Sequence, residues 1–96
     1  AAERTAAVNG RLYPNPFTDL VNIDFNNTAA DNNISVEVYD LSGRLNYRKV
    51  FGKLPVGNNT IKVGAKDASM GTGVYIITLS ANGKALQANK VIRTSK

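Results

Sequence analysis

The alternation of apolar and polar residues over short runs is the feature that most constrains the fold of this chain. At 21–25, Val-Asn-Ile-Asp-Phe, every second side chain is apolar, and the same period recurs at 34–38 and 61–63. A period of two places successive side chains on opposite faces, so these runs predict β-strands with one buried face. The run at 44–51 also alternates, and it predicts a shared face for Leu45, Tyr47 and Phe51.

Two further strands are predicted near the end of the chain. Residues 73–80, Gly-Val-Tyr-Ile-Ile-Thr-Leu-Ser, are apolar at successive positions, which indicates a central strand. The last strand, roughly 84–93, has a weaker pattern.

Glycine and asparagine mark the turns between these runs. Asp40-Leu41-Ser42-Gly43 suits a type I turn, with the Asp40 carboxylate accepting main-chain N–H groups and Gly43 at positive φ. Asn82-Gly83 is the strongest hairpin signal, because this pair favours a type I′ turn. Gly71 and Gly73 are expected to turn the chain into the central strand. A phosphate loop would need a helix behind it.

About seven short strands without a helical period predict an all-β fold, an immunoglobulin-like antiparallel β-sandwich. The chain of 96 residues is long enough for one domain with a modest core. It has no tryptophan or cysteine, which excludes the core of a true antibody domain. Residues 1–10 show no period and are expected to be a linker, and residues 11–96 are expected to form the domain.

The residue types speak against catalysis. The chain has no histidine and no cysteine, so it lacks the commonest general base and the commonest thiol nucleophile. Its aspartates match no EF-hand spacing, and we predict no catalytic residue, metal site or cofactor. The tyrosines fit no RNA-binding pattern, and the longest apolar run is too short to span a bilayer. Neither a nucleic-acid partner nor direct insertion into a membrane is therefore expected.

Charge is distributed unevenly along the chain, whose formal net charge is +5. Residues 1–40 hold two basic and six acidic side chains, a net of −4, whereas residues 41–96 hold ten basic and one acidic, a net of +9. The basic residues either cover the outer faces and edges of strands or form a surface for an anionic partner.

Two motifs lie at the ends of the domain. Tyr13-Pro14-Asn15-Pro16-Phe17 is stiff, because proline fixes its own φ and extends the residue before it. We expect a short polyproline-like lead-in with Tyr13 and Phe17 as hydrophobic anchors. The basic run 89–96 is expected to be either an edge strand protected by its charges or a terminal signal that frays at little cost to the core.

Taken in order, YPNPF at 13–17, VYDLSG at 38–43, GVYIITL at 73–79 and NKVIRTSK at 89–96 resemble the type A C-terminal sorting domain of the type IX secretion system of Bacteroidota. The resemblance covers about residues 11–96. It implies a domain at the end of a secreted cargo protein, which passes through the periplasm and is directed across the outer membrane to the surface or the medium. The implied partners are the translocon, the surface sortase and the upstream cargo. Cleavage would fall in residues 1–10, and the cargo would be anchored to lipopolysaccharide or released.

The resemblance also assigns roles to residues. Its basic terminal strand corresponds to the proposed recognition residues Lys90, Val91, Ile92, Arg93 and Lys96. Its structural motif residues are Tyr13, Pro14, Asn15, Pro16, Phe17, Asp40, Gly43, Gly73 and Tyr75, and the hairpin residues Asn82 and Gly83 join them because of their turn chemistry. The alternative function is a carbohydrate-binding or adhesive module of an extracellular enzyme, although such modules usually display a strip of exposed aromatic residues.

Overall fold

The computed structural model describes residues 11–94 and contains seven strands. They are β1 (Arg11–Tyr13), β2 (Leu20–Asn27), β3 (Asn33–Asp40), β4 (Leu45–Lys53), β5 (Gly57–Gly64), β6 (Gly73–Ala81) and β7 (Lys84–Arg93). The described part of the chain has no helix, and hence none long and apolar enough to cross a membrane.

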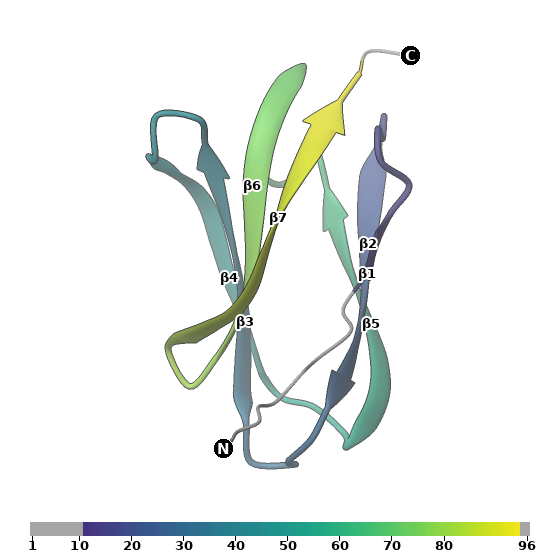
Figure 1. Cartoon of the computed structure of the whole chain (residues 1–96), viewed down its shortest axis with the longest axis vertical. Coiled ribbons are helices and arrows are strands. Elements are labelled where there is room, and N and C mark those ends of the chain that lie inside the picture. The colour runs from purple at the N-terminus through teal and green to yellow at the C-terminus, as the bar shows by residue number, and fades with distance from the viewer. Residues whose placement is uncertain (1–10, 95–96) are drawn as a thin grey trace.

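The strands form two antiparallel sheets that face each other (Figure 1). One sheet has the order β1-β2-β5, and the other has the order β4-β3-β6-β7. This arrangement confirms the predicted immunoglobulin-like β-sandwich, in which β4 belongs to the larger sheet. It also confirms β6 as a central strand, because β6 pairs with β3 on one side and β7 on the other.

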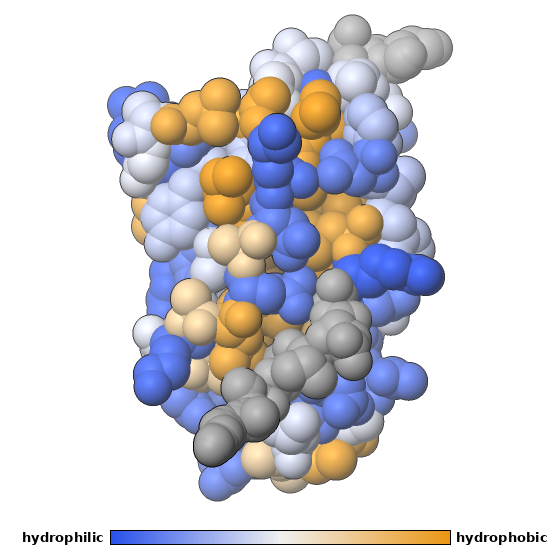
Figure 2. Space-filling model, in the orientation of Figure 1, coloured by the Kyte–Doolittle hydropathy of each residue, from blue (hydrophilic) through white to orange (hydrophobic). Residues whose placement is uncertain are grey.

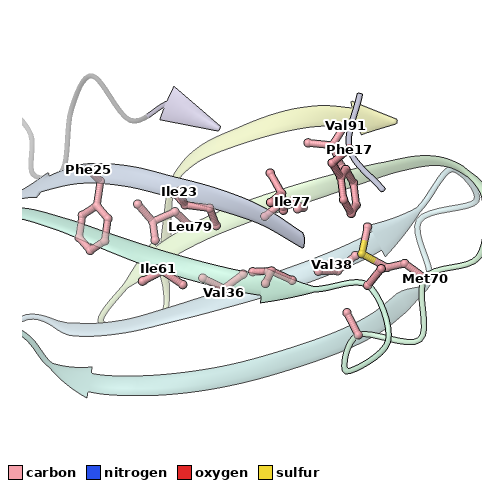
Figure 3. Close-up of a cluster of buried hydrophobic side chains, with 14 of the residues drawn as sticks. Phe17, Ile23, Phe25, Val36, Val38, Ile61, Met70, Ile77, Leu79 and Val91 are labelled. Carbon is pink, nitrogen blue, oxygen red and sulfur yellow. The ribbon is translucent and has the colours of Figure 1, made fainter. Parts of the chain in front are cut away.

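The core lies between the two sheets, where the alternating apolar residues meet (Figure 3). Val21, Ile23 and Phe25 of β2 and Val36 and Val38 of β3 are all at most 2% exposed. Burying a side chain of this size stabilises the fold by roughly 1.5–3 kcal/mol. The predicted inward faces of both strands are therefore confirmed.

The predicted face of β4 is wrong at Leu45. Tyr47 and Phe51 pack against the core, but Leu45 is 48% exposed. The cause is a shift in the register between β3 and β4: Val38 pairs with Tyr47, whereas the next residue of β3, Tyr39, pairs with Leu45. One residue of β4 is thus passed over, and Leu45 joins Tyr39 on the outer face of the sheet.

The polyproline-like path predicted for residues 13–17 is also wrong. The chain bends at 14–16, and the bonds preceding both prolines are cis. Phe17 is an anchor, at 1% exposed, but Tyr13 is 36% exposed. The Tyr13 hydroxyl donates a hydrogen bond to Asp24 Oδ1 at 3.1 Å, and this bond raises the pKa of Tyr13.

A chain of asparagine amides ties three loops together at the end of the sandwich that carries the β6–β7 turn. Asn27 is fully buried and donates to the carbonyl oxygens of Leu54 and Pro55. Asn32 donates to Asn27 Oδ1, and Asn82 in turn donates to Asn32 Oδ1. Asn82 and Gly83 have φ values of 55° and 81°, which confirms the predicted type I′ turn.

Candidate recognition site

Four motifs that are far apart in the sequence meet at one end of the sandwich, at the top of Figure 1. The β1–β2 loop, the β3–β4 turn, the β5–β6 loop and the end of β7 all lie there. Rows of paired residues run across the larger sheet: Asp40 pairs with Tyr75, and Tyr75 pairs with Val91. One residue from each of three motifs thus stands side by side.

The first motif holds the last one. Asn15 Nδ2 donates to the Lys90 carbonyl at 3.1 Å, and Asn15 Oδ1 accepts from Ile92 N at 3.0 Å. Phe17 N donates to the Ile92 carbonyl at 2.9 Å, and Thr94 N donates to the Phe17 carbonyl at 2.8 Å. Residues 15–17 therefore occupy the open edge of β7 near its end.

Arg93 joins two loops to the terminal strand. Its Nε donates to the Thr18 carbonyl at 2.8 Å, and its Nη1 donates to the Met70 carbonyl at 3.2 Å. Hydrogen bonds from a charged guanidinium to carbonyls are stronger than those of neutral donors. Asn46 makes a similar link, donating to the carbonyls of Ala68 and Ser69.

The β3–β4 turn is fixed by Asp40, as predicted. Asp40 Oδ1 accepts from the Ser42 hydroxyl at 2.6 Å and from the main-chain N–H groups of Arg44 and Ser42. The hydrogen bond from the Ser42 hydroxyl is the largest cause of a lowered pKa of the Asp40 carboxyl, and the two main-chain hydrogen bonds lower this pKa further. Gly43 has a φ of 89°, which confirms the predicted need for glycine.

The structure divides the proposed recognition residues. Lys90 is exposed, and Ile92 is 37% exposed. Val91 is fully buried, and Arg93 makes the internal bonds described above. Lys96 lies outside the described residues. β7 pairs with β6 along its length and contributes Val91 to the core. The prediction that the terminal run can fray at little cost to the core is therefore wrong.

The other motif residues fall into two groups. Tyr75 packs against the core, and Gly73 enters β6 at a φ of 142°, as expected of a turn glycine. Pro14 and Pro16 lie in the bend between β1 and Phe17. Asn82 and Gly83 lie at the opposite end of the sandwich, so they belong to the scaffold of the fold and not to this site.

A shallow depression of about 510 Å³ lies between the β1–β2 loop, the β5–β6 loop and Arg93, and Asp19 and Lys66 are among its lining residues. Within residues 11–94, no three acidic, histidine or cysteine side chains are grouped so that they could hold a metal ion. The arrangement can bind a partner through shape, apolar contact and charge.

Sequence reasoning missed the buried polar groups of this fold. Glu37, 7% exposed, accepts hydrogen bonds from the Ser35 and Ser80 hydroxyls and pairs with Arg48 at 3.3 Å. Nothing local in the sequence indicates this, because Ser80 is 43 residues away. The burial of Asn27 could have been predicted, because Asn27 continues the alternation that places Val21, Ile23 and Phe25 on the inward face of the strand.

The fold and the site define an immunoglobulin-like β-sandwich module. Its candidate recognition surface consists of the end where the four motifs meet and the adjoining part of the larger sheet. The family model of the secretion system C-terminal sorting domain matches residues 11–93. The chain belongs to this family, the C-terminal sorting domains of the type IX secretion system. No curated protein matches the chain.

Membership assigns a sorting role in type IX secretion, in a family that is not catalytic. It implies interaction with the secretion system and an attached cargo, and passage through the periplasm to the cell surface or the extracellular space.

Proposed function

We propose that this domain is the signal that directs its cargo through the outer-membrane translocon of the type IX system. The cargo is attached through residues 1–10, the surface sortase cleaves within that segment, and the cargo is then anchored to lipopolysaccharide or released. The observation that carries the proposal is the family match over residues 11–93, whose separated motifs meet at one end of the folded domain.

The geometry favours a folded signal that is read through its surface. Asn15 and Phe17 already bond the main-chain groups of Lys90 and Ile92 on the open edge of β7. A partner strand could therefore pair with the main chain of β7 only at residues 84–89. Beyond residue 89, a partner would recognise the side chains of β7. Val91 and Arg93 support the proposed recognition residues Lys90 and Ile92 from within the fold.

The test is a fusion of residues 1–96 to the C-terminus of a fluorescent protein that carries a signal peptide. It is expressed in a Bacteroidota host with an intact type IX system and in one without the translocon. We expect fluorescence at the surface or in the medium of the intact host only. Retention in the periplasm of both hosts would overturn the sorting role and favour a glycan-binding module.

Deleting the terminal strand is a poor test, because the loss of Val91 and of the bonds to Phe17 would unfold the domain. Lys90→Glu is better, because Lys90 is exposed and its charge is the feature under test. Lys62→Glu on β5, exposed on the other sheet, is the matched control. Reduced export with Lys90→Glu alone would support recognition at β7.

A further inference from the structure

The outer face of the larger sheet carries apolar residues that the fold does not require. Tyr39 pairs with Leu45 on one side and Ile76 on the other, and Val74 pairs with Ile92 in a neighbouring row. We call these five residues the outer stripe. It crosses all four strands near the end where the motifs meet.

These residues face away from the core. Tyr39 lies between Val38, which is buried, and Asp40, and it shares a shallow groove of about 290 Å³ with Leu45 and the Glu37–Arg48 pair. Leu45 is 48% exposed and Ile92 is 37% exposed, and the other three members are partly exposed. The open face of an antiparallel sheet is usually polar, so a continuous apolar stripe on it indicates contact with something else.

The smaller sheet provides an internal comparison. Its outward positions on β2 and β5 are polar apart from Leu20 and Gly64, which pair at one end; among the polar ones are Asn22, Asp24, Thr60 and Lys62. In Figure 2, which views the two sheets from their edges, a group of hydrophobic atoms lies at the top of the view, at the end where the motifs meet, and smaller groups lie below it. No outward row of the smaller sheet is apolar across its paired strands, because its rows include Tyr13–Asn22–Lys62, Arg11–Asp24–Thr60 and Leu20–Gly64. An apolar row across paired strands thus distinguishes the larger sheet.

Positive charge borders the outer stripe. Lys90 pairs with Ile76 and continues the row formed by Leu45, Tyr39 and Ile76. The only carboxylate of the described residues in the groove, Glu37, is already bonded by two hydroxyls and by Arg48. A partner that covers this face therefore meets apolar side chains with the Lys90 ammonium at one end, which forms no ion pair with any of residues 11–94.

From this complementarity we propose that the outer stripe docks an outer-membrane component of the secretion machinery that presents an apolar patch edged by carboxylates. The inference rests on the proposed sorting function and assigns the partner-binding face of that signal. Apolar contact supplies the affinity. The ammonium group of Lys90 pairs with a carboxylate at the edge of the partner's patch and so fixes the relative position of the two surfaces.

The test uses the fluorescent fusion in the intact host with Ile76→Thr and Ile92→Thr combined. Threonine keeps the β-branched shape and removes apolar contact. The matched control combines Leu20→Thr and Val56→Thr, which change exposed apolar residues away from the stripe. We expect the stripe variant to reduce export about tenfold or more, and the control to leave it unchanged.

Thermal unfolding of each purified domain checks that it is folded. If the double variant is unfolded, Leu45→Ser replaces it, because Leu45 lies on the edge strand β4 and is half exposed. Equal export of folded stripe and control variants would overturn this inference and leave the sorting function intact. Failure of the unaltered fusion to be exported would overturn both. A dimer of the isolated domain that Ile76→Thr converts to monomer would show that the stripe binds a second copy instead.

Discussion

Asn27 shows how much one polar side chain contributes in a small core. Its amide is fully buried, bonds two carbonyl oxygens and accepts from Asn32. Asn27→Ala leaves these groups unpaired, so we expect the free energy of unfolding in urea to fall by about 2–4 kcal/mol. The control is Asn26→Ala, an exposed neighbour on β2, for which we expect a change within about 0.5 kcal/mol. Equal effects would contradict this role of the amide.

Asp40 makes stability depend on pH. Because its pKa in the folded state is lowered, its charged form stabilises the fold above the ordinary carboxyl pKa of 3.8, and this contribution is lost as the pH falls through the folded value. Asp40→Asn keeps an acceptor oxygen but cannot carry the charge. We expect it to lower the melting temperature at pH 7, with the difference from the unaltered domain shrinking in acid. A difference that stays constant down to pH about 2 would contradict the linkage.

At the scale of elements, the β6–β7 turn depends on backbone conformation. Gly83 has a φ of 81° with open space where a Cβ would lie, so Gly83→Ala meets no steric clash with the rest of the fold. The cost is conformational, and we expect a loss of about 1–2 kcal/mol in the free energy of unfolding. Gly71→Ala is the control, because a Cβ there would lie 3.9 Å from the Tyr75 hydroxyl without a positive φ. A loss at Gly71 as large as at Gly83 would show that glycine is needed for another reason.

The elements also show what the sequence could and could not predict. The strands β2, β3 and β6 follow from local alternation, and the turns at Asp40 and Asn82 follow from local chemistry. Leu45 was misplaced because the register shift at Val38 and Tyr39 arises from pairing between strands. The contacts of Asn15 with Lys90 and of Arg93 with Thr18 join residues 75 positions apart, and no local pattern encodes them.

At the scale of the whole molecule, the buried core residues of the described part, 11–94, extend from Phe17 to Val91. We therefore expect a chain trimmed to residues 11–96 to keep the free energy of unfolding of the longer chain within about 0.5 kcal/mol. Urea denaturation of both chains is the measurement. A loss of more than about 1 kcal/mol would contradict the domain boundary at residue 11, because it would place stabilising contacts before it.

The bonds between Phe17 and the end of β7 have a consequence for timing. A polypeptide is synthesised from its N-terminus, so Phe17 leaves the ribosome or the inner-membrane channel well before its partners Ile92 and Thr94. The larger sheet lacks its edge, and the core lacks Val91, until that moment. A sorting domain built in this way is completed only when residues 92–94 have emerged, so a cargo chain truncated before them lacks the folded domain.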